Sequence, residues 1–141
     1  MIDKKIKNEK DCIDYIVEVC EKNKHTEICG FVGYNGDSVV VRQCENIADD
    51  KVNHFAISPV DYLLFQEDND FLFLFHSHIS GDEKPSEFDV VMSENCCLPF
   101  FIYSLNNKKS NIYMPKKHEV DVLMINRFKE YVWLQLDYME F

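Results

Sequence analysis

The chain has 141 residues, of which 25 are Asp or Glu and 15 are Lys or Arg, so its formal net charge is −10. Its 46 % apolar and 28 % charged residues are typical of a globular protein, and the length predicts a single domain over 1–141. The longest apolar runs, Phe71–Phe75 and Leu98–Tyr103, are far shorter than the roughly 20 residues of a membrane-spanning helix. The charged start has no apolar segment behind it, so we expect no membrane partner and a cytoplasmic location.

Acidic residues are concentrated between Asp61 and Glu94, where the only base is Lys84. Nucleic acids are bound through Lys and Arg, so no nucleic-acid partner is expected. The acidic stretch is either a solvated surface or a field that attracts a cation, a metal or a basic substrate segment, and these two interpretations are compatible.

Six cysteines raise the question of disulfides or a zinc finger. No C-x2-C pair is present, and the adjacent Cys96-Cys97 suits neither arrangement. Cys12 and Cys20 fall on the apolar stripe of an expected helix, where a thiol packs like a small apolar residue. We therefore expect reduced, structural cysteines, as in a protein made in the cytosol.

The first half of the chain predicts a helix, a β-hairpin and a second helix. Apolar residues at i, i+3, i+4 spacing favour an amphipathic helix over 9–24. Two strand-like runs, 28–34 and 37–44, flank Asn35-Gly36, which is typical of a type I′ turn with positive φ at both residues. Ser58-Pro59 then marks a helix start, with Ser as the N-cap and Pro at the first helical position.

The second half predicts a buried strand over 71–78, a helix over 86–95, strands over 99–105 and 111–114, and a helical tail over 119–138. The resulting order, α-β-β-α-β-α-β-β-α, indicates a mixed α/β (α+β) domain with a sheet between helices. The tail also contains Trp133, and its apolar stripe belongs either to the core or to a surface that pairs with another chain. The stripe consists of Val120, Leu123, Met124, Phe128, Val132, Leu136 and Met139.

Residues 75–89 hold the side chains most suited to metal chemistry. On a strand, His76 and His78 project from the same face, and two imidazoles side by side form half of a zinc site. The alternative is a pair of partly exposed polar residues at a strand end. Ser86 and Asp89 form a capping-box-like pattern that needs no function, yet Asp89 would then face the two histidines. Two His and one carboxylate leave the fourth tetrahedral position open, as in a catalytic zinc site.

Glu27 lies where the first helix meets the first strand, and it is the candidate proton acceptor beside such a site. The alternative is an ordinary solvent-facing glutamate. Glu27, His76-Ser77-His78, Ser86 and Asp89, at their observed spacing, together resemble the complete signature of the JAB/MPN domain, or JAMM metallopeptidase, family. The resemblance includes the Cys29-Gly30 context and implies a single domain with a central, mostly antiparallel sheet flanked by helices.

The resemblance implies that His76, His78 and Asp89 bind Zn2+, that Glu27 acts as general base and then acid, and that Ser86 stabilises the oxyanion. The expected reaction is hydrolysis of an amide or isopeptide bond in a protein or peptide substrate. Ser77 is expected to be a spacer that points to the opposite face of the strand.

Family members act on ubiquitin, on prokaryotic ubiquitin-like proteins or on sulfur-carrier proteins, or accompany phage tail assembly. This chain resembles the minimal prokaryotic form, and the stretches 53–62 and Leu98-Pro99 resemble the phage-tail subgroup. That subgroup often includes a cell-wall peptidase domain, which this sequence does not show. A bacterial or phage-encoded, virion-associated protein is therefore expected, and a metal-retaining docking or assembly module without hydrolytic activity is the alternative.

Three further residues near these motifs have competing interpretations. His54 is either a surface or structural residue or part of the substrate groove. His25 is either a cation at a helix C-terminus or a neighbour of the site. Cys29 shares a strand face with Glu27, so it is expected to help wall the site.

Overall fold

The computed structural model describes the backbone of residues 3–139 and the side chains of residues 3–132. Its elements are β1 (Asp3–Ile6), α1 (Glu9–Lys22), β2 (Cys29–Asn35), β3 (Ser38–Cys44), α2 (Pro59–Asp68), β4 (Asp70–His78), α3 (Glu87–Cys96), β5 (Phe100–Ser104), β6 (Lys109–Tyr113) and α4 (Val122–Met139). The strands form one sheet in the order β1-β3-β2-β4-β5-β6, and only β4 and β5 pair in parallel. The predicted mixed α/β fold with a mostly antiparallel sheet is confirmed.

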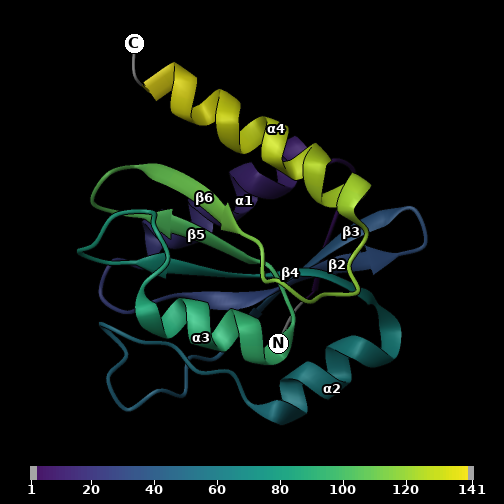
Figure 1. Cartoon of the computed structure of the whole chain (residues 1–141), viewed down its shortest axis with the longest axis horizontal. Coiled ribbons are helices and arrows are strands. Elements are labelled where there is room, and N and C mark those ends of the chain that lie inside the picture. Colours follow the sequence, from purple (N-terminus) through teal and green to yellow (C-terminus); the bar gives the residue numbers. More distant parts are fainter. Residues whose placement is uncertain (1–2, 140–141) are drawn as a thin grey trace.

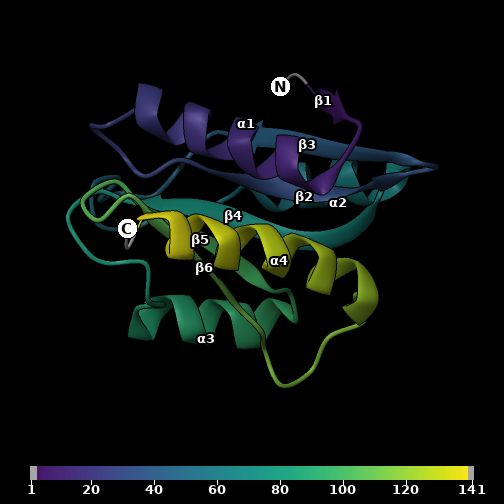
Figure 2. The ribbon, with the colours of Figure 1, turned by 90° about the horizontal axis from the view of Figure 1, so that it is seen from above.

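Helices cover both faces of this sheet, as Figures 1 and 2 show. α1 and α4 contact one another over one face, and α2 and α3 lie on the other. Alternation along β4 decides which side chain meets which layer. Phe73 and Phe75 belong to the core under α1 and α4, whereas Leu74 belongs to the core under α2 and α3. His76 therefore faces the α2–α3 side.

The predicted hairpin between β2 and β3 is confirmed, but its turn lies one residue later than expected. Asn35 pairs with Ser38 at the ends of the strands, so Gly36 and Asp37 are the central residues. Gly36 has φ of 61°, and neither Asn35 nor Asp37 is among the described residues with positive φ. Positive φ at the first central residue alone is the pattern of a type II′ turn, which requires Gly there.

The edge strand β1 is absent from the sequence prediction. Of its four residues only Ile6 is buried, so the sequence shows no alternation of apolar and polar residues. β1 is held by pairing with β3, and the Asp3 carboxylate accepts a hydrogen bond from Nη2 of Arg42 at 2.7 Å. This contact spans 39 positions of sequence, so no local pattern indicates it.

The helical tail differs in part from its prediction. α4 forms, and Phe128 and Val132 are buried as expected, but Leu123 is 74 % exposed and does not belong to the buried stripe. The side chains of Trp133, Leu136 and Met139 lie outside the described residues. No helix in the described part of the chain is both long and apolar enough to cross a membrane.

The predicted reduced state of the cysteines agrees with the structure, in which all six are free thiols. Cys12 and Cys20 are fully buried on the inner face of α1, as predicted. Burial raises the pKa of Cys20 to about 12, so this thiol stays protonated and packs as an apolar group.

Candidate metal centre

The two histidines of the motif come from the end of β4, a central strand between β2 and β5. His76 is fully buried, and its ring stacks on Phe55 with centroids 4.4 Å apart and meets Phe100 edge-on at 5.6 Å. His78, two residues on, lies closer to solvent. The i, i+2 spacing places both rings on the same face, as predicted.

The third member of the group comes from the first turn of α3. Ser86 is the N-cap, and its Oγ accepts a hydrogen bond from the Asp89 amide at 3.0 Å. The Asp89 carboxylate accepts from the Ser86 amide, also at 3.0 Å, which completes a capping box. Asp89 is only 3 % exposed, and the same carboxylate contacts both histidines. The capping function and the proposed ligand function therefore coexist in one residue.

The side chains of His76, His78 and Asp89 converge. The Nε2 atoms of His76 and His78 are 3.2 Å apart, and each lies near a different oxygen of Asp89, at 3.1 and 2.9 Å. Ligands bound to tetrahedral zinc at about 2.0–2.1 Å are themselves roughly 3.3 Å apart. The observed contacts of 2.9–3.2 Å are close to this spacing, and one ligand atom from each residue lies within 4.8 Å of the others, so the donor set is compatible with one shared ion. Among the described residues, this is the His, Cys and carboxylate group that could hold a metal ion.

The protonation states of the group also suit a cation. Burial opposes ionisation of Asp89, but its hydrogen bonds with His76 and His78 outweigh burial and hold its pKa well below the usual range. Burial lowers the pKa of His76, which favours the neutral, metal-binding imidazole. Nδ1 of His78 lies 2.7 Å from the Asp82 carbonyl and donates to it, so Nε2 is the nitrogen that would bind a cation. Burial opposes ionisation of His78, but its hydrogen bonds with Asp89 and the Asp82 carbonyl outweigh burial and raise its pKa, so a cation would displace the proton that Nε2 shares with Asp89. Nδ1 of His76 is buried without a hydrogen-bond partner in the described part of the chain.

Glu27 lies beside this group. The residue precedes β2, is 5 % exposed, and lines a pocket of about 190 Å³ together with His78 and Asp89. Burial raises the pKa of Glu27 to about 8, with the opposing field of His78 and the reinforcing field of Asp89 as smaller influences. The pKa of this carboxyl group therefore lies close to neutral pH, the range in which a group that accepts and returns a proton is most effective.

Ser86 lines the pocket beside the metal group, whereas Ser77 does not, as predicted. Ser86 is exposed and lines the same pocket, and because its Oγ lone pair accepts the Asp89 amide, its hydroxyl proton remains free to donate. Ser77 is fully buried, accepts a hydrogen bond from the Ile28 amide at 2.9 Å, and is not among the residues that line the pocket.

The three residues with competing interpretations are now placed. His54 lines the pocket and packs on Phe88 of α3, with ring centroids 5.0 Å apart. His25 is exposed and does not line the pocket. Cys29 is opposite His76 in the sheet, but it does not line the pocket and its thiol lies 3.8 Å from the Cys44 carbonyl. Cys29 therefore lies on the same face of the sheet as His76 without lining the pocket itself.

Three residues at the site had no predicted role. Phe55 supports the ring of His76, the Asp82 carbonyl orients His78, and Asn46 bonds to the main chain of Glu27. Phe55 follows His54 in a stretch that the sequence already singled out. No local signal identifies Asn46 or Asp82, because both act through long-range or main-chain contacts.

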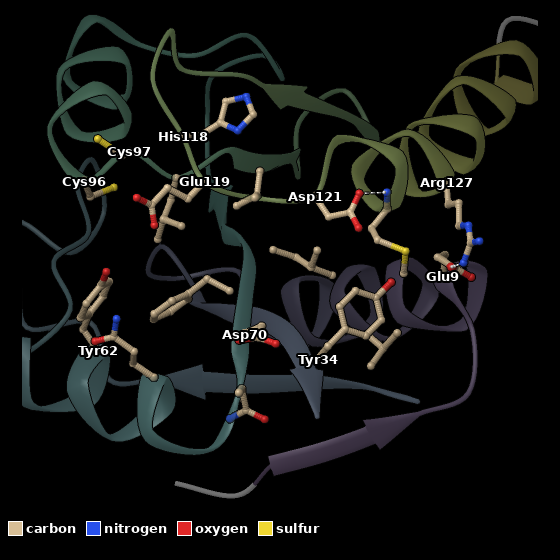
Figure 3. Close-up of a pocket in the computed structure, with 18 of the residues that line it drawn as sticks. Glu9, Tyr34, Tyr62, Asp70, Cys96, Cys97, His118, Glu119, Asp121 and Arg127 are labelled. Atoms are coloured by element: carbon tan, nitrogen blue, oxygen red, sulfur yellow. Dashed lines mark hydrogen bonds and ion pairs between the residues drawn. The ribbon is translucent and has the colours of Figure 1, made fainter. Parts of the chain in front are cut away.

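A second, larger pocket of about 1220 Å³ lies at the opposite end of β4 (Figure 3). Tyr34, Tyr62 and Asp70 lie around it, and residues 117–121, which lead into α4, also line it. Two polar atoms of its lining residues, Tyr34 Oη and His118 Nδ1, are buried without a hydrogen-bond partner in the described part of the chain. None of the residues that line this pocket belongs to the candidate metal group, so the two sites are separate.

The sheet topology, the His-x-His pair on β4 and the capping aspartate of α3 together define a JAB/MPN-like domain with a candidate His2Asp metal centre. The chain belongs to the family described as prokaryotic homologs of the JAB domain, whose sequence pattern matches residues 9–116.

Three known proteins are similar to this chain. A protein from Desulfitobacterium hafniense, with a structure determined in solution, superposes with a TM-score of 0.58 at 22 % identity, over 80 % of this chain and 93 % of its own, which supports the fold. A JAB1/MPN domain protein from Archaeoglobus fulgidus gives a TM-score of 0.47 at 16 % identity, over 79 % of this chain and 90 % of its own. Tail tip assembly protein K of Escherichia phage N15 is 28 % identical over 92 residues. That match covers 65 % of this chain and only 38 % of the phage protein.

Proposed function

We propose that the chain is a zinc-dependent hydrolase of amide or isopeptide bonds in a protein or peptide substrate. The observation that carries this proposal is the position of Glu27, whose buried carboxyl group opens into the same pocket as His78 and Asp89. A purely structural metal site has no need of a proton acceptor beside it. His76, His78 and Asp89 would hold the ion, and zinc supplies Lewis acidity that activates water and polarises a carbonyl at neutral pH.

Other residues of the pocket would transfer protons, stabilise the oxyanion and contact the substrate. Glu27 accepts a proton from the attacking water and returns it to the leaving amine, a role that its raised pKa supports. The free hydroxyl proton of Ser86 donates to the oxyanion that forms on the substrate carbonyl. His54 and Phe88 form an aromatic wall against which the substrate chain packs.

The lining of the pocket also bears on the substrate. No Lys or Arg is found among the described residues that line it, although they include two carboxylates, Glu27 and Asp89. A free carboxylate next to the scissile bond would find no Lys or Arg side chain to pair with there. This favours an internal amide or an isopeptide bond, as in a ubiquitin-like conjugate or a phage structural protein, over removal of a C-terminal residue from a sulfur-carrier protein.

The second candidate is a metal-retaining assembly module, and it is favoured by the similarity to a phage N15 protein named for tail tip assembly. In that case the chain would act by docking in a virion. A phage-encoded, virion-associated protein fits either candidate, and the cell-wall activity expected of longer relatives would require sequence beyond this chain.

One experiment separates the two candidates. The zinc-loaded wild type and Glu27→Gln are incubated with ubiquitin-like isopeptide conjugates and with tail proteins, and products are measured by mass spectrometry. We expect new termini or released lysine amines with the wild type alone. Absence of cleavage by the zinc-loaded wild type, combined with equal tail-protein binding by the wild type and Glu27→Gln, would favour the assembly module.

A further inference from the structure

Asn46 lies two residues after β3, at the start of the loop that leads to α2, and it is only 8 % exposed. Its Nδ2 donates to the carbonyls of Glu27 and His54, both at 3.0 Å. Its Oδ1 accepts from the amides of Ala48 and Ala56, both at 3.1 Å. Two donors and two acceptor positions are the full capacity of a side-chain amide, so this residue is completely satisfied.

Glu27 is held by this loop and not by the sheet. It precedes β2, and both of its main-chain polar groups bond to the loop. The Glu27 amide donates to the Lys51 carbonyl at 2.7 Å, and the Glu27 carbonyl accepts from Asn46. The sheet bonds begin one residue later, where Ile28 exchanges bonds with Ser77.

Two further hydrogen bonds of the Asn46 side chain are made to the main chain on either side of Phe55. The His54 carbonyl and the Ala56 amide are the main-chain groups on either side of it, and both bond to Asn46. Phe55 is 1 % exposed and stacks on the ring of His76. One side chain therefore connects the main chain of Glu27 to the aromatic ring that supports a candidate ligand.

We propose that Asn46 is a positioning residue that fixes Glu27 in relation to the His76, His78 and Asp89 group. The proposal rests on the proposed function of Glu27. Asn46 does not touch the Glu27 carboxyl group and acts through the main chain. Aspartate cannot replace it, because a carboxylate has no donor and would turn a negative oxygen toward two carbonyl oxygens.

The first test measures amide hydrogen exchange in Asn46→Asp, with Asn69→Asp as a matched control. Asn69 is 7 % exposed and its Nδ2 donates to the Phe65 carbonyl at 3.0 Å, but it lies at the end of α2, away from the site. We expect the amides of Glu27, Ala48 and Ala56 to exchange about tenfold faster in Asn46→Asp and at the wild-type rate in Asn69→Asp. Asn46→Ser, which keeps one hydroxyl donor, serves as a milder variant if Asn46→Asp does not fold.

The second test asks whether the site itself responds. Wild type, Asn46→Asp, Asn69→Asp and Glu27→Gln are loaded with cobalt, and visible absorption is followed against pH. We expect each variant to bind one cobalt, because the ligands are intact. The pH at the midpoint of the absorption change should shift in the same direction in Asn46→Asp as in Glu27→Gln. In Asn69→Asp this midpoint should equal that of the wild type.

The outcomes separate this proposal from the proposed function. A shift in Glu27→Gln with none in Asn46→Asp would overturn the positioning role and leave the function of Glu27 standing. No shift in either variant would overturn the function proposed for Glu27, and the positioning role with it. Unchanged exchange at Glu27 in a folded Asn46→Asp would show that the main-chain bonds do not hold this segment.

Discussion

The Nε2 atoms of His76 and His78 lie 3.2 Å apart, and both face the carboxylate of Asp89. With one proton between them the two ring nitrogens can share a hydrogen bond, whereas two protons, or two lone pairs, facing one another at this distance repel. A cation between them removes this conflict, and the depressed pKa of Asp89 supplies negative charge on the third side. The arrangement is therefore one that could hold a metal ion.

Ser86→Ala separates catalysis from metal binding. The substitution removes the N-cap acceptor of α3, so it should cost about 1 kcal/mol of unfolding free energy. Zinc should stay bound, because Ser86 is not one of the three converging residues, whereas hydrolysis should fall by about 100-fold or more from the loss of an oxyanion donor. The measurements are urea unfolding, metal content and turnover.

Ser58→Ala is the matched control, since Ser58 caps α2 through the Val60 amide at 3.2 Å and lies outside the pocket. It should lose similar stability without losing activity. Equal activity of the two serine variants would remove Ser86 from the mechanism.

Glu27→Gln should change how the stability of the metal-free protein depends on pH. Burial raises the pKa of Glu27 to about 8, against 4.5 in the unfolded chain. Between these values the folded state binds more protons than the unfolded state, so the Glu27 contribution to stability falls as pH rises from about 4.5 to about 8. The wild type should therefore lose stability relative to Glu27→Gln across this window, with no further change above it. The free energy of unfolding is measured by urea unfolding of chelator-treated protein at each pH. If the wild type and Glu27→Gln showed the same pH dependence, the pKa of Glu27 would not be raised by folding.

Phe55→Leu tests the support of His76. Loss of the stacked ring should cost on the order of 1 kcal/mol of stability and weaken zinc binding by up to about tenfold, because the packing around a ligand fixes its orientation. Phe65→Leu is the control, since Phe65 is equally buried in the same core but contacts Phe31 and Phe71. Calorimetric zinc titration of both variants decides the matter, and equal affinities would contradict a role for Phe55.

Much of the site follows from local sequence periodicity. The two-residue period of a strand puts His76 and His78 on one face, and the Ser-x-x-Asp pattern puts Asp89 in the first turn of a helix. The capping box is present, and the same Asp89 carboxylate also contacts both histidines. These predictions needed only local geometry within residues 75–89 and the resemblance to a known family.

What the sequence did not predict depends on contacts across the fold. β1 has one buried residue and is held by its pairing with β3, so no local pattern reveals it. Asn46 bonds to a carbonyl 19 positions earlier, and the thiol of Cys29 lies near the Cys44 carbonyl in the core. Leu123 has the spacing of a core residue, yet it lies at the exposed start of α4.

The central claim is that His76, His78 and Asp89 hold a metal ion beside a catalytic Glu27. The most direct test is metal content by mass spectrometry on protein purified without chelator, for the wild type, Glu27→Gln and His78→Ala. We predict about one zinc per chain in the wild type and in Glu27→Gln, and none in His78→Ala. Absence of zinc from all three after reconstitution, or loss of zinc in Glu27→Gln, would contradict the account.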